Sequence, residues 1–265
     1  MLKRRFARKQ VPVIGQGTWR FHGPQGVEAL RTGIELGLTH IDTAEMYGSE
    51  EAVGQAIEGR RDEVFLVSKV LPSNATRRGT VRACEQSLHR LRTDRLDCYL
   101  LHWPGSHPLE ETIAGFEDLA AAGKIRSYGV SNFDEGLLEE AARIAGAGKI
   151  ACNQVLYNLA ERHVEARVLP KCRELGAVLV GYSPFDGLPV GGELAAVAQE
   201  LKATTRQVAL AFLTRLDDTF AIPKASHVEH VRENAGAGAL VLTAAQISRL
   251  DRAYPVHVRR ELPTS

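Results

Sequence analysis

Four residues within the first 102 positions could together handle a proton. Asp42 follows a short apolar run and lies five positions before Tyr47, Lys69 ends the apolar run 64–69, and His102 follows the run 96–101. A phenol donates a proton readily near neutral pH only if its pKa falls from about 10. A lysine ammonium favours the phenolate, and an aspartate keeps that lysine charged. The pattern therefore predicts that Lys69 lowers the pKa of Tyr47 and that Asp42 supports Lys69.

The chemistry that this set would support is the reduction of a carbonyl group. A neutral imidazole such as His102 can donate a hydrogen bond to a carbonyl oxygen on which negative charge develops. The set contains no nucleophile, so the natural reagent is a hydride from a cofactor. Two of the residues also have an ordinary interpretation, since Asp42 alone could cap a turn and His102 alone could be structural, and Tyr47 alone would indicate nothing. The prediction rests on their combination.

The elements that must position these residues alternate between short apolar runs and longer amphipathic stretches. This alternation predicts parallel strands joined by helices. We predict strands at 40–43, 64–69, 96–101, 126–130, 151–155, 177–182, 219–223 and 239–242. We predict helices at 49–59, 77–92, 110–122, 135–145, 164–175, 193–215 (two helices), 227–235 and 243–252, with Ser49, Thr80, Asp134 and Thr204 as start signals.

Eight strand–helix units without a doubly wound nucleotide motif predict an α/β fold, the (β/α)8 TIM barrel. Residues 5–15 precede the first predicted barrel strand and suggest an N-terminal β-hairpin that closes the bottom of the barrel. The stretch 243–252 predicts an extra C-terminal helix. We expect residues 1–265 to form a single domain.

Polar residues recur at the C-terminal ends of the predicted strands, where barrel enzymes place their active sites. Besides the four residues above, these positions carry Ser131, Asn132, Gln154, Tyr182, Ser183 and Lys224. The strands were not chosen by these residues. Their recurrence therefore indicates one shared site.

Composition limits the partners. The net charge of +1 creates no field that would recruit nucleic acid or an anionic membrane, and no apolar run approaches the roughly 20 residues that cross a bilayer. A basic N-terminal cluster resembles the start of a signal peptide, but residues 11–17 after it are too short and too glycine-rich for an export core. That cluster consists of Lys3, Arg4, Arg5, Arg8 and Lys9. We expect a cytoplasmic protein, a monomer, with no nucleic-acid or membrane partner.

No metal site is predicted. The four cysteines, Cys84, Cys98, Cys152 and Cys172, are widely spaced and have no histidine at metal-ligand spacing, so we expect reduced packing residues.

Residues 37–54, which include His40-Ile41-Asp42-Thr43-Ala44-Glu45-Met46-Tyr47-Gly48, resemble the first signature of the aldo-keto reductases. Further blocks agree in order: 15–19, 67–69, 97–104, 129–133, 153–154, 182–184, 222–224 and 233–234. The resemblance extends from about residue 11 to 252. It implies an NAD(P)H-dependent oxidoreductase that reduces aldehydes and ketones to alcohols.

The resemblance also implies residue roles. The family's catalytic tetrad falls on Asp42, Tyr47, Lys69 and His102, with Tyr47 as general acid and His102 orienting the substrate carbonyl. Trp19 and Trp103 would line the substrate pocket beside Tyr47 and His102, although either could be ordinary packing. The nicotinamide ring would stack on Tyr182, with its carboxamide bound by Ser131, Asn132 and Gln154. The remaining implied cofactor contacts are Gly17, Thr18, Asp42, Ser183, Pro184, Phe185, Lys224, Ser226, His230, Glu233 and Asn234.

The adenosine end departs from the family pattern. Lys224 would meet phosphate oxygens, but Ala225 replaces the usual serine, and His230 falls where an arginine often binds the 2′-phosphate. Arginine can form a bidentate, permanently charged contact with phosphate, whereas histidine cannot. We predict NADPH as the cofactor, with NADH tolerated.

Two short segments suggest the substrate class. The link after His102 and the tail after Leu250 are short, and family members with tight pockets have long versions of both. An open pocket would favour small aldehydes, 2-oxoaldehydes such as methylglyoxal, and dicarbonyls. Residues that could tune the choice are Phe21, Glu45, Met46 and Phe133.

Two other functions are compatible with parts of the pattern. A regulatory subunit that binds NADPH with little turnover would not need Asp42, Tyr47, Lys69 and His102 together. An unrelated barrel hydrolase or lyase could use Asp42 and His102 as a pair, but would leave Tyr182, Gln154 and Lys224 without a role.

Overall fold

The computed structural model describes residues 1–21 and 23–264. Its strands are β1 (Lys3–Phe6), β2 (Lys9–Pro12), β3 (Gln16–Gly17), β4 (His40–Asp42), β5 (Phe65–Val70), β6 (Cys98–Leu101), β7 (Tyr128–Ser131), β8 (Ile150–Leu156), β9 (Val178–Tyr182) and β10 (Thr219–Ala221). Its α-helices are α1 (Gly23–Glu35), α2 (Glu50–Ala56), α3 (Arg77–Arg90), α4 (Leu109–Ala121), α5 (Glu135–Ala145), α6 (Val168–Leu175), α7 (Gly192–Glu200), α8 (Thr205–Leu213), α9 (Val228–Ala237) and α10 (Ala244–Ala253).

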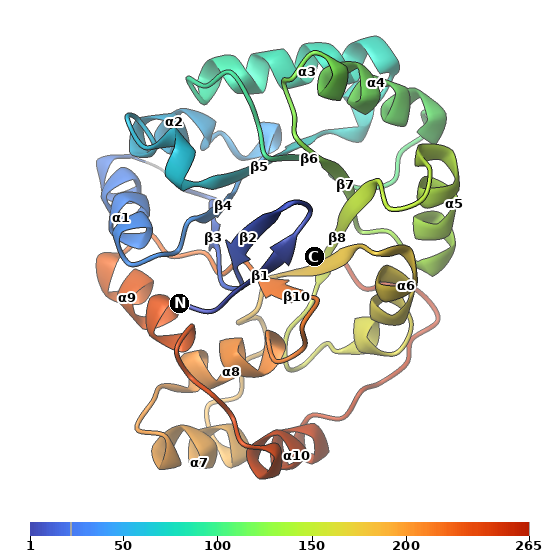
Figure 1. The fold of residues 1–265 in the computed structure, drawn as a ribbon. Helices are drawn as coiled ribbons and strands as arrows, with labels where there is room; N and C mark the ends of the chain where they lie inside the picture. The colour runs from blue at the N-terminus through green and yellow to red at the C-terminus, as the bar shows by residue number, and fades with distance from the viewer. Residues whose placement is uncertain (22, 265) are drawn as a thin grey trace.

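Strands β3 to β10 form a parallel sheet in sequence order, and the helices surround it (Figure 1). The sheet closes because the segment around β3 meets the end of β10: Ile14 bridges Ala221, and Gly17 bridges Lys224. The Gly15 amide also donates to the Ala221 carbonyl at 2.8 Å. This arrangement confirms the predicted α/β barrel.

The identity of one barrel strand was predicted wrongly. Residues 239–242 form no strand, and Val241 in this run is 82% exposed, while Leu240 and Leu242 pack against the small cluster between α7, α8 and α10. The eighth strand is β3 instead. A two-residue strand is too short to show an alternation of apolar and polar residues. Its place is fixed by the close approach of its backbone to the segment after β10. A Cβ on Gly17 would lie 2.6 Å from the Ile222 carbonyl oxygen.

Helix α1 was also missed. Glycines at 23, 26 and 33 and a proline at 24 lower its helix propensity, although Val27, Leu30 and Ile34 line its buried face. Tertiary contact explains Gly33, because a Cβ there would lie 2.0 Å from the Gln16 side chain.

Two of the four predicted helix start signals are confirmed as N-caps. Asp134 accepts from the Leu137 amide, and Thr204 forms a capping box, so both are confirmed as N-caps. Ser49 precedes α2 without a side-chain cap bond. Thr80 was wrong: α3 is capped by Thr76, and Thr80 is buried inside the helix.

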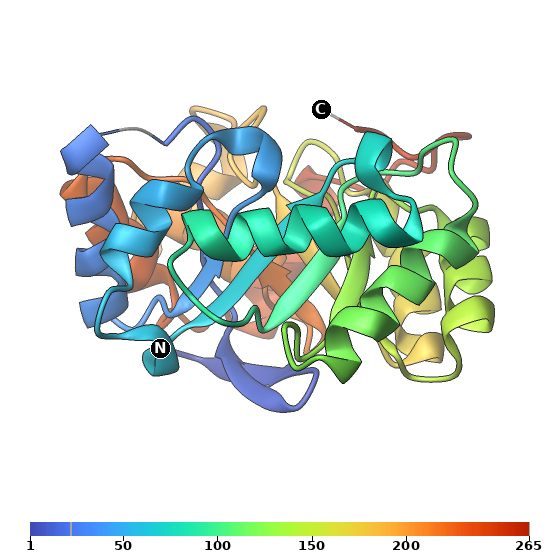
Figure 2. The same ribbon diagram turned by 90° about the horizontal axis from the view of Figure 1, so that it is seen from above.

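The hairpin β1–β2 covers the N-terminal end of the barrel, at the edge opposite the C-terminal segment (Figure 2). Phe6 is fully buried there and packs on Phe65 at the start of β5 and on Phe220 of β10, with ring centroids 4.7 and 5.2 Å away. The hairpin therefore plugs the bottom, as predicted, and leaves the C-terminal strand ends free for a site.

Candidate active site

The deepest part of the candidate site is a buried ion pair. Asp42 ends β4 and Lys69 lies near the end of β5, and both side chains are at most 1% exposed. Lys69 Nζ donates to Asp42 Oδ1 at 2.5 Å and to the Thr43 carbonyl at 2.8 Å. Gln154 Nε2 donates to the other Asp42 oxygen at 2.7 Å. Both Asp42 oxygens are thus bonded, to Lys69 and Gln154. Among the described residues neither ring nitrogen of His102 bonds a carboxylate, as a hydrolase or lyase pair would need.

The Tyr47 hydroxyl lies between Lys69 and His102. It is 3.5 Å from Lys69 Nζ and 3.3 Å from His102 Nε2. Tyr47 reaches this position from the short 3-10 helix η1 (Glu45–Tyr47), which Gly48 ends in the left-handed conformation. The structure therefore brings all four predicted catalytic residues together from three consecutive strands.

The electrostatics agree with the prediction for His102 and Lys69 but not for Tyr47. Burial and the nearby Lys69 charge lower the pKa of His102 to about 3, so its imidazole is neutral. Burial opposes the charge on Lys69, but Asp42 and Tyr47 outweigh it and raise the lysine pKa. For Tyr47, burial outweighs the opposing effect of Lys69 and raises the phenol pKa. The predicted lowering was wrong, because the sequence showed the charge but not the desolvation.

A second set of polar residues surrounds this centre. Ser131 Oγ donates to the Gln154 carbonyl at 2.8 Å, and Asn132 Nδ2 donates to the His102 carbonyl at 3.2 Å. The Tyr182 hydroxyl donates to Asn132 Oδ1 at 2.8 Å. Asn132 itself adopts a φ of 60°, in the left-handed region that asparagine tolerates. The structure thus gathers Ser131, Asn132, Gln154 and Tyr182 beside the ion pair.

Two tryptophans form the exposed margin of the site. The ring centroid of Trp19 lies 4.9 Å from that of Tyr47, and the ring centroid of Trp103 lies 4.7 Å from that of His102. They are 44% and 37% exposed. Of the residues predicted to tune the substrate, Met46 is 41% exposed, whereas Phe21 and Phe133 are each 1% exposed and belong to the core.

Several predicted cofactor contacts, among them the phosphate-contacting Lys224, belong to β3 or follow β3, β9 and β10. Lys224 is exposed and bridges Gly17, while Ser183, Pro184 and Phe185 follow β9 directly. Thr18 is fully buried, and its hydroxyl donates to the Asp42 carbonyl at 3.0 Å, so this hydroxyl bonds to the main chain at the end of β4.

The predicted adenosine-end residues lie on or just before α9. His230 and Glu233 face each other one turn apart, with Nδ1 3.6 Å from Oε2, and Ser226 precedes the helix. Asn234 is 3% exposed, and its Oδ1 has no hydrogen-bond partner among the described residues.

Sequence reasoning missed two groups. The Thr43 carbonyl is a main-chain ligand of Lys69, which no residue type could reveal. Glu45 was considered for substrate choice, but its carboxylate accepts from the Leu71 amide and the Asn74 side chain instead. The signal in the sequence that could have identified Glu45 is its position between Asp42 and Tyr47, two predicted catalytic residues.

Comparison with known proteins identifies the family. The model described as "Aldo/keto reductase family" matches residues 13–191 and 186–255. This chain is an aldo/keto reductase. Methylglyoxal reductase YeaE of Escherichia coli (strain K12) is 44% identical to it over 261 residues, covering 92% of each chain. Glyoxal reductase of Bacillus subtilis (strain 168) is 32% identical and covers 91% of this chain and 88% of its own.

Solved aldo/keto reductase structures agree. The Klebsiella pneumoniae aldo/keto reductase in complex with NADP and acetate superposes with a TM-score of 0.93 at 44% identity, covering 100% of this chain and 99% of that one. A putative 2,5-diketo-D-gluconic acid reductase B gives a TM-score of 0.89 at 32% identity, covering 100% and 97%. Within residues 1–21 and 23–264, no helix has the length and apolar character needed to cross a membrane.

Proposed function

We propose that this aldo/keto reductase reduces small aldehydes and 2-oxoaldehydes with NADPH, and that Tyr47 is the proton donor. The observation that carries the proposal is the Tyr47 hydroxyl, held within 3.5 Å of both Lys69 Nζ and His102 Nε2. A substrate carbonyl oxygen placed between Tyr47 and His102 would meet two hydrogen-bond donors. Bound NADPH would supply the hydride for the carbonyl carbon.

The residues of the site would manage the proton. Because burial raises the pKa of Tyr47, its phenol remains protonated at neutral pH, which is the form a donor needs. As the substrate oxygen gains negative charge, Tyr47 transfers its proton, and the Lys69 ammonium stabilises the phenolate left behind. Asp42 keeps Lys69 charged and aimed. His102, neutral because its pKa is lowered to about 3, would donate a hydrogen bond without competing for the proton.

The residues present fit a nicotinamide cofactor. Ser131, Asn132 and Gln154 offer an amide-binding set beside Asp42, and Tyr182 stands next to Asn132 with a half-buried ring. The unpartnered Asn234 Oδ1 on α9 suits an adenine amine. Lys224, which bridges Gly17, is an exposed cation suited to phosphate. NADH would be tolerated, because His230 lacks the bidentate contact that an arginine gives the 2′-phosphate.

The substrate class follows from the half-exposed Trp19 and Trp103 beside the donor pair. Flat, open walls suit small carbonyl compounds, and a relative of this chain carries the name methylglyoxal reductase. All the proposed site residues come from one chain, so we propose that a monomer is active.

The proposal is tested by following NADPH and NADH oxidation with methylglyoxal and a panel of aromatic aldehydes, in the wild type and in Tyr47→Phe. We expect kcat with NADPH to fall by orders of magnitude in the variant, roughly the 10²–10⁴-fold that general acid catalysis contributes. NADPH binding, measured by fluorescence, should persist because the cofactor residues are unchanged. Full turnover by Tyr47→Phe would refute the mechanism, and absence of cofactor binding in the wild type would refute the reductase function.

A further inference from the structure

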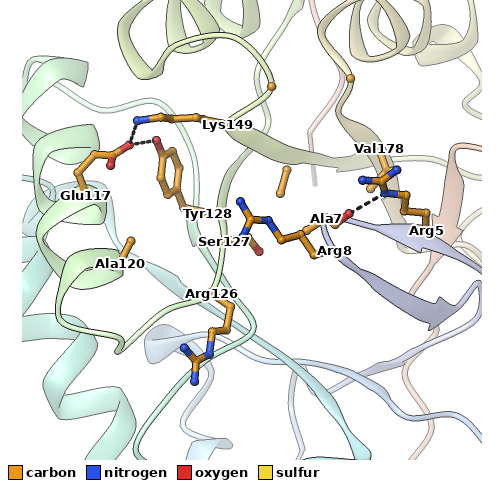
Figure 3. A pocket seen from close by; sticks show the side chains of 13 residues that line it. Arg5, Ala7, Arg8, Glu117, Ala120, Arg126, Ser127, Tyr128, Lys149 and Val178 are labelled. Carbon is orange, nitrogen blue, oxygen red and sulfur yellow. Dashed lines mark hydrogen bonds and ion pairs between the residues drawn. The ribbon is translucent and has the colours of Figure 1, made fainter.

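A cavity of about 580 Å³ lies at the N-terminal end of the barrel, beside the β1–β2 turn and opposite the strand ends that carry the candidate active site. Figure 3 shows the side chains that line it. Its walls come from β1–β2, α4 and the starts of β7, β8 and β9. The residues that bear charge are Arg5, Arg8, Glu117, Arg126 and Lys149. Its size falls in the range of about 300–1,000 Å³ typical of small-ligand sites.

The charge of the cavity is unbalanced. Four exposed cations and one carboxylate, Glu117, line it, and Glu117 already accepts from Lys149 Nζ at 2.8 Å and from the Tyr128 hydroxyl. In the described part of the chain, the side chains of Arg8 and Arg126 have no hydrogen-bond or ion-pair partner, and Arg5 donates only to the Ala7 carbonyl. This local excess contrasts with a net charge of +1 for the whole chain.

Only some of the basic residues of the hairpin contribute to this excess of positive charge. Of its five basic residues, Lys9 pairs with Asp97 at 2.6 Å, and Arg4 donates to the Thr214 carbonyl at 2.6 Å. These two stabilise the hairpin's attachment. Arg5 and Arg8 instead line the cavity, where they join Arg126 and Lys149 from other elements.

We propose that this cavity binds a small polyphosphate. Arginine guanidinium groups form bidentate contacts with phosphate, and several cations around one cavity favour a ligand with more than one phosphate group. The cavity presents no exposed ring for a nucleobase among its described lining residues, since Tyr128 is 4% exposed and stacks on Phe116. Recognition would therefore lie in the phosphates alone.

Calorimetric titration with tripolyphosphate, in the presence of saturating NADP⁺ to occupy the cofactor site, tests the proposal. We expect binding by the wild type, at least about tenfold weaker binding by the double variant Arg8→Ala/Arg126→Ala, and unchanged binding by Arg78→Ala/Arg82→Ala, which removes two exposed arginines of α3. NADPH turnover should be unchanged in both variants, so the outcome is independent of the proposed reductase function.

Three results would overturn the proposal: no binding, binding abolished by NADP⁺, or equal binding by both double variants. If citrate bound as tightly as tripolyphosphate, the cavity would bind anions in general, and the proposed recognition of phosphate would be wrong. If ATP bound much more tightly than tripolyphosphate, recognition through the phosphates alone would be refuted.

A separate inference concerns Glu45, and it rests on the proposed function of Tyr47 as the proton donor. Glu45 Oε1 accepts from the Leu71 amide at 2.5 Å and from Asn74 Nδ2 at 3.1 Å. Glu45 begins the η1 turn that ends at Tyr47, and Leu71 lies two residues after Lys69. The carboxylate therefore ties the turn that carries the proton donor to the strand that carries Lys69. We infer that Glu45 is a positioning residue for Tyr47.

The test uses Glu45→Ala and Glu45→Gln. A glutamine Oε1 can accept from both donors, so we expect Glu45→Gln to keep kcat within about threefold of the wild type. Glu45→Ala should lower kcat by about tenfold or more, because a small misplacement of a catalytic group is costly, while the Kd for NADPH stays unchanged. Glu58→Ala, which removes an exposed glutamate just after α2, is the matched control and should retain kcat.

Wild-type kcat in Glu45→Ala, equal losses in the alanine and glutamine variants, or a parallel loss of NADPH affinity would refute the positioning role. Tyr47→Phe separates this failure from failure of the mechanism. If Tyr47→Phe is inactive and Glu45→Ala is fully active, only the role of Glu45 is wrong.

Discussion

Two buried histidines show how surroundings decide the properties of a residue. Burial and Lys69 lower the pKa of His102 to about 3, and its Nε2 faces the Tyr47 hydroxyl. His40, at the start of β4, has a pKa lowered to about 4 mainly by burial. Its ring lies against Phe6, Phe65 and Phe220, and neither ring nitrogen has a hydrogen-bond partner among the described residues. One histidine faces the Tyr47 hydroxyl, whereas the other is enclosed by aromatic rings.

His40 should make stability depend on pH. Its pKa in the folded protein, about 4, lies below the 6.5 of a free histidine, so the unfolded chain takes up a proton first as pH falls. Its contribution is fully present above pH 6.5 and is lost as pH falls from 6.5 towards 4, by up to about 1.4 kcal/mol per pH unit. His40→Leu should reduce the loss of unfolding free energy between neutral pH and pH 5, measured by urea denaturation.

His102 acts in the same direction, so the variant removes only part of the pH dependence. The exposed His89, changed to Gln, is the control and should leave the dependence unaltered. If His40→Leu had the same pH profile as the wild type, the buried neutral state assigned to His40 would be wrong.

The residue types of the site were predictable, but their electrostatic environment was not. The sequence placed an aspartate, a lysine and a histidine at consecutive strand ends and a tyrosine five residues after the first. The structure brings these side chains within hydrogen-bond distance of one another in a chain of contacts. The pKa of Tyr47 depends on how deeply its phenol is buried, which the contacts of the folded chain determine.

At the scale of elements, long periodic segments were predicted well, whereas the two-residue strand β3 and the glycine-rich helix α1 were missed. Strands β5 and β8 and helices α3 and α5 lie within a few residues of their predicted bounds. Strand β3 has two residues and α1 is rich in glycine, so neither carries a strong local pattern. Both are held by contacts with distant parts of the chain: Gly17 with the segment after β10, and Gly33 with Gln16.

The hairpin offers a test of an element's contribution to stability. Phe6 is fully buried against the bottom of the barrel, so Phe6→Ala should lower the free energy of unfolding by about 3–5 kcal/mol. Leu2→Ala, at a side chain that is 48% exposed, should cost far less. Because the hairpin lies opposite the candidate active site, kcat of folded Phe6→Ala should match the wild type. Equal stability losses in the two variants would show that the hairpin does not plug the barrel.

At the scale of the whole molecule, a buried ion network ties the C-terminal helix to the barrel. Glu165 accepts from Arg162 and Arg215 at 2.7–2.8 Å and from the Tyr157 hydroxyl at 2.6 Å. Arg162 also bonds Asp251 of α10 at 2.7 Å. Burial opposes the Glu165 charge, but the two arginines outweigh it and lower the pKa to about 2.

This network should contribute to acid stability. The pKa of Glu165 falls from 4.5 to about 2 on folding, so its contribution is present above pH 4.5 and is lost as pH falls towards 2. Glu165→Gln leaves the buried Arg162 and the mostly buried Arg215 without this carboxylate and should lower the unfolding free energy at neutral pH by about 3 kcal/mol. Denaturant titration measures the loss.

Glu174→Gln is the matched control, since Glu174 is 61% exposed in its ion pair with Lys171. Its cost should stay below about 1 kcal/mol, as for other surface pairs. A similar small cost for Glu165→Gln would mean that the buried network adds little to stability.

The sequence by itself determined the family, the barrel class and the types of the site residues, because signature motifs and the periodicity of long elements are local properties. Only the tertiary structure decided which segment closes the barrel, how far burial raises the pKa of Tyr47, and where Glu45 and the cations of the lower cavity lie. These features depend on contacts between residues distant in sequence. No local pattern encodes them, since desolvation and close approach exist only in the folded chain.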